Sequence, residues 1–447
     1  MRIPRTPPST SELFARHATG DRLFPITRSV NGPSVDGRYL HWDRLHYYTP
    51  PEGLSLTEWW VGLKLSRRAQ RKDIALRDRS GRSFGFSIVD PLPQGLHEID
   101  LRAGGSIRMP ELATNRETQK EFLVRSLLEE AFTSSQLEGA ATTRDRAKEI
   151  IRRGRPPHDQ GERMVLNNYQ TMEHILGLRD QPLSKQMIFE IHRLVTDGTL
   201  PDPSAAGRFR RDDEYKVVGD HLGEVVFHEP PAASELEARM EALCAFANGD
   251  GAGPFVHPVI RSMIVHFWLA YDHPFVDGNG RMARALFYWS MLRHDYWLFQ
   301  YVSISTIILK APMKYERAFL ETETDECDLT YFLIYHMNVI LRALEAAHTY
   351  IRRKIDLIQS VATDVRGAVD LNQRQRTLLV DAIRHPGATL TVETHKRTFG
   401  VATQTARTDL IELVERGLLH MGKAGRAFTF RPTPDLNLAL KKLDHQA

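Results

Sequence analysis

The chain has 447 residues, a formal net charge of +3 and 42% hydrophobic residues, which is enough for two or three domains with sizeable cores. A charge so close to neutral does not by itself indicate a nucleic-acid or membrane partner. Its two cysteines, Cys244 and Cys327, do not suggest a disulfide, and without a bilayer-length apolar run or a signal-peptide core we expect a cytoplasmic protein.

The first 105 residues are predicted to form a small α+β module. Residues 1 to about 50 are rich in proline and polar side chains and show no helical or strand period, so we expect an arm or an irregular cap there. The other elements predicted in this module are a helix after the capping box of Ser55 and Glu58, a strand over residues 84–88, and a helix over residues 94–103 that leads to Gly104-Gly105.

A second domain is predicted over residues 106–365, and it begins with a long helix. A capping box at Thr114 and Glu117 opens this helix, and leucine and phenylalanine side chains line one side of it. Residues 134–139, with the sequence SSQLEG, end it. Taken alone, this ending is typical of a helix that stops at a glycine and carries a solvated glutamate.

Two core helices follow in the same domain. Apolar residues recur with helical spacing from Met164 to Leu176 and from Met187 to Val195, and Ser184 caps the second helix. Three histidines of this domain are interpreted as satisfied core residues, because no set of ligands with metal-site spacing surrounds them. These are His192, His257 and His266.

A hairpin is predicted between these helices and the next helical stretch. Two β-prone runs, Tyr215–Val218 and Glu224–Phe227, flank a loop with a glycine at each end. From the residues alone, the hairpin could simply lie on the surface without a role.

Residues 273–284, with the sequence HPFVDGNGRMAR, combine a candidate base, an acid, paired glycines and two arginines, and we take them as the active site. Apolar residues from Ile260 to Tyr271 recur with the period of a helix that has one buried face, and Pro274 ends that helix. A helical pattern restarts at Ala285. The residues between predict a tight loop that opens onto a helix N-terminus, where unpaired N–H groups and the helix dipole bind anions.

Each polar residue of the motif suits a definite chemistry. Arg281 and Arg284 are spaced i, i+3 on one helix face, and each charge-assisted hydrogen bond to a phosphate contributes about 1.5 to 3 kcal/mol. Asp277 offers a hard oxygen ligand, and triphosphate sites hold Mg²⁺ through one or two carboxylates plus phosphate oxygens. His273, at the entrance of the loop, is the candidate general base.

Three other interpretations of the motif are weaker. Gly278, Gly280 and Ala283 match the dinucleotide-binding pattern G-x-G-x-x-A, but that pattern must follow a strand, and here a helix precedes it. A calcium loop would need an oxygen ligand where Arg281 stands and a glycine at its sixth position. A plain turn between two core helices would explain the glycines and Pro274 but not the four charged or titratable residues together.

The same twelve residues resemble, at every defined position, the HPFx(D/E)GNGRxxR signature of Fic proteins (filamentation induced by cAMP). The resemblance implies a helical core that transfers AMP from ATP to a hydroxyl side chain of a target protein and releases pyrophosphate. It assigns the general base to His273, Mg²⁺ binding to Asp277, and phosphate contacts to Arg281 and Arg284. The implied anion hole consists of Gly278, Asn279 and Gly280.

Three further stretches resemble parts of Fic proteins. The sequence SSQLEG resembles their (S/T)xxxE(G/N) inhibitory helix, here over about residues 114–139, in which Glu138 would pair with Arg284 and pull it away from the γ-phosphate. The hairpin resembles their flap, which takes the target segment as an added strand. Tyr315 resembles a tyrosine near the nucleotide base, although Glu316 follows it where the family has a second tyrosine. The residues matched in the inhibitory helix are Ser134, Glu138 and Gly139.

Residues 366–447 are predicted to form a third domain. Three helices, over residues 373–384, 391–399 and 403–417, precede a hairpin, and this order resembles a winged helix-turn-helix. From residue 371 onward there are twelve Lys and Arg against seven Asp and Glu, which favours DNA weakly. Winged helices also bind proteins, so both kinds of partner stay open.

These observations predict a mainly α protein: a Fic-type helical core with a β-hairpin flap, a small N-terminal α+β module and a C-terminal winged helix-turn-helix. The expected function is an autoinhibited protein adenylyltransferase that uses ATP and Mg²⁺. The alternatives are removal of AMP or transfer of another nucleotide by the same site, and a nucleotide-sensing transcriptional regulator that binds DNA. The partners considered are an unidentified target protein, DNA or protein at the C-terminal module, and a second copy of the chain in a homo-oligomer; no membrane partner is expected.

Overall fold

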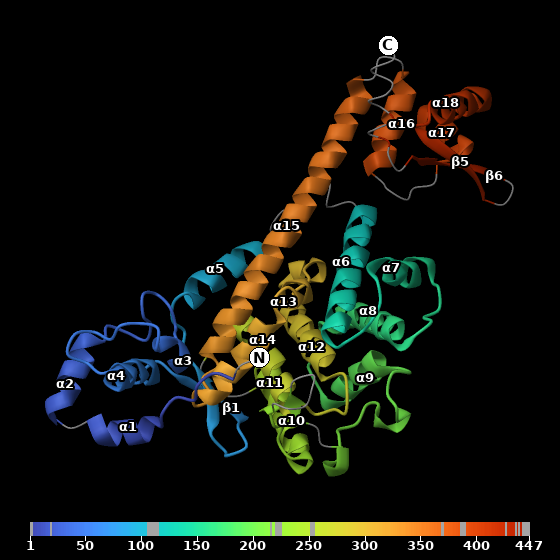
Figure 1. The fold of residues 1–447 in the computed structure, drawn as a ribbon. Helices are drawn as coiled ribbons and strands as arrows, with labels where there is room; N and C mark the ends of the chain where they lie inside the picture. The colour runs from blue at the N-terminus through green and yellow to red at the C-terminus, as the bar shows by residue number, and fades with distance from the viewer. Residues whose placement is uncertain are drawn as a thin grey trace. The chain divides into compact units, whose positions relative to one another are not determined.

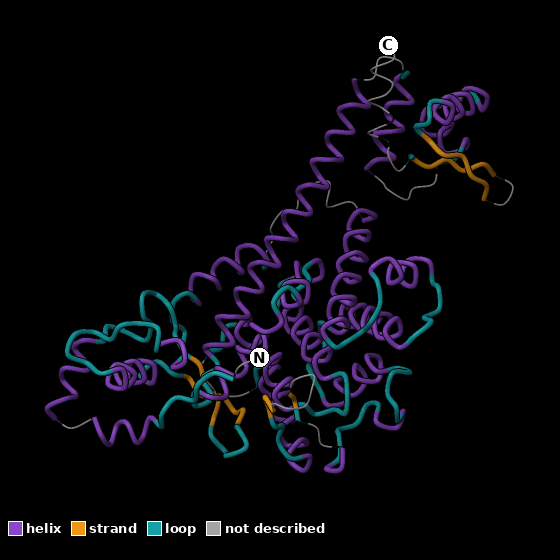
Figure 2. Tube along the Cα trace, in the orientation of Figure 1, coloured by secondary structure: helices purple, strands orange, loops and turns teal. Residues whose placement is uncertain are grey.

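The computed structural model is mainly helical, as predicted, and its described residues also form three antiparallel sheets of two strands each (Figures 1 and 2). The chain divides into two compact units, Met1–Ile107 with Ser126–Leu344 and Arg108–Arg125 with Glu345–Ala447. None of the helices in the described part of the chain has both the length and the apolar character needed to cross a bilayer. The structure describes residues 3–17, 20–104, 116–214, 217–219, 226–250, 255–367, 371–384, 390–424, 427–433, 436 and 439.

The first 50 residues contain helices, so the expected arm or irregular cap is wrong for those stretches, whereas residues 30–41 contain no helix. Helices α1 (Thr10–His17) and α2 (Gly20–Ser29) pack on α4 (Leu56–Arg68), which begins at the predicted capping box, and α3 (Trp42–Leu45) precedes it. Helices of 8, 10 and 4 residues contain too few turns for a period to be recognised in the sequence. The buried cluster of this region is Leu13, Ile26, Leu40, Trp42, Leu45, Trp59, Trp60, Val61 and Leu63.

The strand predicted over residues 84–88 is β2 (Ser83–Phe86), and it pairs with a strand that the sequence did not reveal, β1 (Lys72–Arg77). The apolar residues of β1 are the consecutive Ile74, Ala75 and Leu76, so an alternating apolar pattern is missing from its sequence. Helix α5 (Leu92–Ala103) follows close to its predicted bounds. These residues belong to the same compact unit as the helical core, and the division of the chain into three domains stays a prediction.

The core of this unit is built around α11 (Pro258–Asp272) and α12 (Asn279–Arg293), which pack against each other. Every residue of α12 from Arg281 to Leu292 is buried, so this helix has no solvent face. The other helices are α6 (Arg116–Leu137), α7 (Arg144–Arg153), α8 (Gln160–Leu178), α9 (Lys185–Thr196), α10 (Leu236–Asn248), α13 (Ser305–Leu309), α14 (Pro312–Thr324) and α15 (Thr330–Gly367), with 3₁₀ turns at Pro203–Ala205, Asp212–Glu214, Ala233–Glu235 and Trp297–Tyr301. Residues 116–125 of α6 and 345–367 of α15 belong to the second unit.

Several predicted helix boundaries of the core can be compared with the structure. Ser184 caps α9 as predicted, because its Oγ accepts a hydrogen bond of 3.2 Å from the Met187 N–H. The capping box predicted at the start of α6 involves Thr114, which lies outside the described residues. The predicted hairpin is present as β3 (Val218–Gly219) and β4 (Val226–His228), whereas the residues of its loop lie outside the described part.

The C-terminal unit contains three helices and a hairpin in the predicted order. These are α16 (Gln373–Arg384), α17 (Val392–Phe399), α18 (Thr403–Glu415), and the paired strands β5 (Leu419–Ala424) and β6 (Ala427–Pro432). They share one buried cluster that includes Leu379, Leu410, Leu413, Leu418 and Phe430. The identification of this arrangement as a winged helix, and any partner it binds, stay predictions.

Candidate active site

The loop between α11 and α12 is held in one conformation by its own sequence. Helix α11 ends as predicted, with His273 as its C-cap in the left-handed conformation (φ 45°), followed by Pro274. Helix α12 starts after Gly278, which also has a positive φ of 85°. The side chain of Asn279 accepts a hydrogen bond from the Phe275 N–H (2.9 Å) and donates one to the Phe275 carbonyl (2.8 Å). An anion-binding contribution of Asn279 would therefore come from its main chain.

His192 supports the same loop from α9. Its Nε2–H donates to the Asp277 carbonyl (3.0 Å), its Nδ1 accepts from the Gly207 N–H (2.9 Å), and its ring stacks on Phe275 with centroids 3.8 Å apart. Burial lowers the pKa of His192 to about 4, which keeps the ring neutral with the proton on Nε2. The interpretation of His192 as a satisfied core histidine agrees with these contacts, but its support of the loop was not predicted.

The other two histidines differ from each other. His266 is fully buried, and its ring nitrogens contact the Tyr315 hydroxyl (2.8 Å) and His336 (3.0 Å), as befits a core residue. His257 is not a core residue: it is partly exposed, caps the start of α11, and pairs with Asp100 at 3.1 Å. The prediction failed for His257 because it precedes Pro258 at a helix N-terminus, where a ring nitrogen can accept from a free N–H.

The candidate base, His273, is partly buried and has a lowered pKa. Burial is the main cause, nearby His228 and Arg210 add to it, and Glu138 opposes it, so that the pKa lies at about 4. The ring is therefore neutral at physiological pH, as a general base must be. Arg210 holds the loop in place: its Nε donates to the His273 carbonyl (2.9 Å) and its backbone N–H to the Pro274 carbonyl (2.9 Å).

Arg210 also reaches the Pro231 carbonyl (2.5 Å), just beyond the flap strand β4, so one side chain connects the base and the flap. Sequence reasoning missed this residue. Arg210 stands 63 residues before His273, and no periodic or spacing signal relates the two.

The N-terminus of α12 has no side-chain cap of its own, and Glu138 lies directly against it. A Cβ added to Gly280 would be only 2.7 Å from the carboxyl carbon of Glu138 and 3.0 Å from its Oε2. The Glu138 carboxylate also forms an ion pair of 2.7 Å with Arg284 of the same helix. A carboxylate thus occupies the position where the helix dipole and the arginine favour an anion.

The Glu138–Arg284 pair, which the resemblance predicted, is part of a larger contact that is buried on the side of Arg284 and Ser134 and partly exposed at Glu138. The Arg284 side chain is 2% exposed and that of Glu138 is 27% exposed. Nε of Arg284 donates to the Ser134 hydroxyl (2.8 Å), and Nη2 donates to the Ser134 carbonyl (3.0 Å). Burial works against the arginine charge, but Glu138 beside it raises the pKa of the guanidinium, so Arg284 stays charged.

The end of α6 also forms the predicted C-cap. Gly139 has a left-handed φ of 87°, and the Ala140 N–H returns to the Ser135 carbonyl (2.9 Å). The plain interpretation was therefore right about the glycine; Glu138 is partly exposed to solvent, but its carboxylate is paired with Arg284 and is not free in water. The αL conformation of Gly139 turns the chain immediately after Glu138.

Arg281 lies inside the protein. Its side chain is inaccessible, Nη1 donates to the Val195 carbonyl (2.9 Å), and Nη2 lies 3.4 Å from Asp277 Oδ2. Burial lowers the pKa of this guanidinium. In this geometry Arg281 contacts the loop from the protein interior, and its contact with a phosphate stays a prediction.

Asp277 is the accessible acid of the loop. Its side chain is 46% exposed, and Oδ1 accepts from the Gly278 N–H (2.7 Å). The described residues contain no group of three or more His, Cys, Asp or Glu that could hold a metal alone. This donor set fits Mg²⁺ that takes one protein carboxylate and completes its shell with phosphate oxygens and water.

Tyr315 lies close to the inhibitory contact. Its hydroxyl bonds His266 of α11, and burial is the main cause that raises the pKa of Tyr315, while Arg284 lowers it and Glu138 raises it. Tyr315 is thus grouped with Arg284 and Glu138, and its position beside a nucleotide base stays a prediction.

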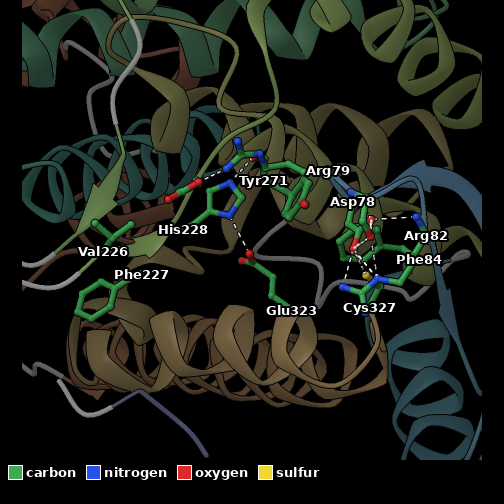
Figure 3. Close-up of a pocket in the computed structure, with 12 residues that line it drawn as sticks. Asp78, Arg79, Arg82, Phe84, Val226, Phe227, His228, Tyr271, Glu323 and Cys327 are labelled. Atoms are coloured by element: carbon green, nitrogen blue, oxygen red, sulfur yellow. Dashed lines mark hydrogen bonds and ion pairs between the residues drawn. The ribbon is translucent and has the colours of Figure 1, made fainter. Parts of the chain in front are cut away.

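Beside the flap lies a pocket of about 450 Å³ (Figure 3). Strand β4 forms one side of it and the β1–β2 turn another, and an ion pair of Arg79 with Glu229 joins the two. Tyr271, in the last turn of α11 before His273, also lines it. The pocket is lined by Asp78, Arg79, Ser80, Arg82, Phe84, Val226, Phe227, His228, Glu229, Tyr271, Glu323 and Cys327.

Comparison with known proteins identifies a family model, curated proteins and a solved structure that are similar to this chain. Residues 182–291 match the family model "Fic/DOC family". A stretch of 109 residues is 35% identical to the protein adenylyltransferase Fic of Drosophila sechellia and of Drosophila melanogaster, and it covers 24% of this chain and 20% of each relative. The match thus spans about a fifth of the length of these curated relatives. A solved Fic family protein from Desulfovibrio desulfuricans G20 shares the fold at 20% identity and a TM-score of 0.50, over 76% of this chain and 94% of that protein.

Proposed function

Because this chain contains a Fic/DOC family domain, we propose that it is a protein adenylyltransferase, which transfers AMP from ATP to a hydroxyl side chain of a target protein and which Glu138 holds inactive. The matched relatives are named protein adenylyltransferases, and this supports the class of reaction.

The proposed reaction needs one base and a held triphosphate. His273, neutral at physiological pH, takes the proton of the incoming hydroxyl, whose oxygen forms a bond to the α-phosphorus. The bond from the α-phosphorus to the oxygen bridging to the β-phosphate breaks, and pyrophosphate leaves. Arg210 keeps His273 in its left-handed conformation, so the base is positioned before the substrate arrives.

The start of α12 would hold the phosphates. Its uncapped N–H groups and the dipole favour negative charge, and Gly280 allows a phosphate to approach the backbone. Arg284 would pair with the γ-phosphate once it is released from Glu138. Asp277 would hold Mg²⁺, which when bound neutralises phosphate charge.

The observation that carries the proposal is the placement of the Glu138 carboxylate on Arg284 and against Gly280. The two hydrogen bonds to Ser134 do not neutralise the buried charge of Arg284, and Glu138 supplies the negative charge that a phosphate would otherwise bring to this arginine. This placement supports autoinhibition by competition between a carboxylate and a phosphate for one arginine.

The test is incubation of the wild-type protein and its Glu138→Gly variant with α-labelled ATP and a cell lysate. Label on a lysate protein or on the enzyme itself, retained after denaturation and lost in a Glu138→Gly/His273→Ala double variant, is the expected result. Parallel reactions with α-labelled GTP, CTP and UTP decide the nucleotide. No protein-bound label with any nucleotide would contradict the transferase assignment, and a gel shift with DNA from its own promoter region would then favour the regulator.

A further inference from the structure

His228, in the flap strand β4, binds two oxygen atoms from two other elements. Its Nε2 lies 2.6 Å from the carbonyl oxygen of Tyr271 in α11, and its Nδ1 lies 2.7 Å from Oε2 of Glu323 in α14. The His228 side chain is 9% exposed and that of Glu323 is 21% exposed. Figure 3 shows the imidazole pointing toward Glu323 at the side of the pocket.

The identity of the two partners fixes where protons must be. A carbonyl oxygen can only accept, so Nε2 must carry a proton; an ionised carboxylate can also only accept, so Nδ1 must carry one too. Both bonds are satisfied at once by an imidazolium beside a carboxylate. The other arrangement with two good bonds is a neutral ring whose Nδ1 accepts from a protonated Glu323.

The charged form suits this site better than the neutral form does. The pair is in contact with solvent through the pocket, which reduces the desolvation cost of an ion pair. At distances of 2.6 and 2.7 Å, both contacts have the length of charge-assisted hydrogen bonds. The neutral arrangement would also require Glu323 to be protonated although its side chain is 21% exposed, and a carboxyl group in contact with water favours the ionised form.

We propose that His228 is a positioning residue for AMP transfer: as an imidazolium held between the Tyr271 carbonyl and the Glu323 carboxylate, it fixes the flap against the end of α11 and keeps a positive charge beside His273. The first part follows from the two bonds, since Tyr271 lies two residues before His273 and His228 ends the flap strand. The role in transfer rests on the proposed function, whereas the protonation state does not.

The consequence for the base is electrostatic. His228 is one of the groups that lower the pKa of His273, after burial, and so helps to keep His273 free to accept a proton. Among the described residues, the other charged or titratable groups near His228 include Tyr271 of α11, whose ring centroid lies 4.6 Å from that of His228, Glu323 of α14, Asp272 of α11, which is paired with Arg239, and His273 itself. On its own strand, Glu229 is paired with Arg79 of the β1–β2 turn.

The first experiment measures protons directly and needs no activity. The full-length protein is labelled with ¹⁵N-histidine, and the His228 signals are assigned by their loss in His228→Gln. At pH 7 we expect both ring nitrogens of His228 to carry a proton, and one of them to lose it in Glu323→Gln. An unprotonated nitrogen at pH 7 in the wild-type protein would overturn the proposal, whatever the protein catalyses.

The second experiment tests the effect on the base, with Glu138→Gly as the background so that transfer is measurable. The rate of transfer, as kcat/KM, is followed from about pH 3.5 to 8 in that protein and with Glu323→Gln or His228→Gln added, because the pKa of His273 lies at about 4. Removal of the positive charge should move the acidic limb upward by roughly 0.5 to 1 pH unit, because a like charge next to His273 has been lost. The variants should also transfer more slowly at pH 7, through the looser flap.

The matched control is Glu190→Gln, which breaks another histidine–carboxylate pair of the same unit, His174 with Glu190 at 3.0 Å. The Glu190→Gln variant should leave the acidic limb of the pH profile at its original pH. Equal slowing at every pH in Glu323→Gln, with no movement of the limb, would reduce His228 to a structural contact and overturn its effect on the base. Failure of all proteins to transfer AMP would count against the proposed function, and the labelling experiment would still decide the charge of His228.

Discussion

Replacement of Glu138 by glycine should convert a slow enzyme into an active one. In the structure, Glu138 accepts a 2.7 Å charge-assisted hydrogen bond from Arg284, whose side chain is shielded from water, whereas that of Glu138 is 27% exposed. Such a bond contributes about 1.5 to 3 kcal/mol. If this free energy must be lost before the arginine can pair with the γ-phosphate, its removal should raise the transfer rate by about 10- to 100-fold at an ATP concentration below saturation.

The variant should fold, because the arginine keeps other partners. Both hydrogen bonds from Arg284 to Ser134 remain, and position 138 follows the last residue of α6, where a glycine costs little. Gln136→Gly is the matched control: it weakens the same end of the helix and leaves the carboxylate in place.

The assay compares initial rates of AMP transfer from α-labelled ATP at equal protein concentration. We expect Glu138→Gly to be fast and both the wild-type protein and Gln136→Gly to be slow. If Glu138→Gly is no faster than the wild type while it binds ATP, the ion pair is not what limits transfer, and the reasoning from the Glu138 contact is wrong. If Gln136→Gly is equally fast, loosening of the helix end explains the activation and the carboxylate does not.

Three other outcomes are expected. His273→Ala, in the Glu138→Gly background, should lower transfer by about 10²- to 10⁴-fold while calorimetry shows unchanged ATP binding, since the imidazole acts on the incoming hydroxyl; unchanged labelling would refute the assignment. Removal of residues 371–447 should leave self-labelling in place and change the choice of lysate target, because every residue with a proposed role in the reaction precedes residue 371 in the sequence. Loss of labelling in a folded truncated protein would show that the C-terminal module supports the site. Thermal unfolding should occur at a lower temperature at pH 5 than at pH 7, because burial lowers the pKa of His41 to about 4 and that of His336 to about 3, while both rings take up protons near pH 6.5 once the chain is unfolded. Each of the two histidines then lowers the free energy of unfolding by up to about 1.4 kcal/mol per pH unit as the pH falls below 6.5. An unchanged melting temperature would contradict the burial of both as neutral rings.

Much of the site could be predicted because its signals are local. Proline and glycine mark where α11 stops and α12 starts, and the positive φ at position 278 is predictable because a glycine occupies it. The hairpin and the C-terminal elements were likewise visible in short runs. The resemblance to Fic proteins then connected Glu138 with Arg284 over 146 residues, which no periodicity could do.

The missed features depend on contacts that spacing does not encode. Arg281 was placed with Arg284 on one helix face, which is correct, but α12 is buried on all sides, so a shared face does not mean access to a ligand. His228 meets Tyr271 over 43 residues and Glu323 over 95. Such long-range polar contacts arise only when the helices pack, and neither composition nor period records them.

The position of Glu138 at the end of α6 also determines how the inhibition would respond to conditions. An inhibitor that is part of the same chain has a local concentration set by geometry, so dilution of the protein does not remove it, unlike a separate inhibitory subunit. Because the carboxylate and the phosphate compete for one arginine, the inhibited fraction falls as the ATP concentration rises. Such an enzyme would be insensitive to its own abundance and sensitive to the supply of its nucleotide.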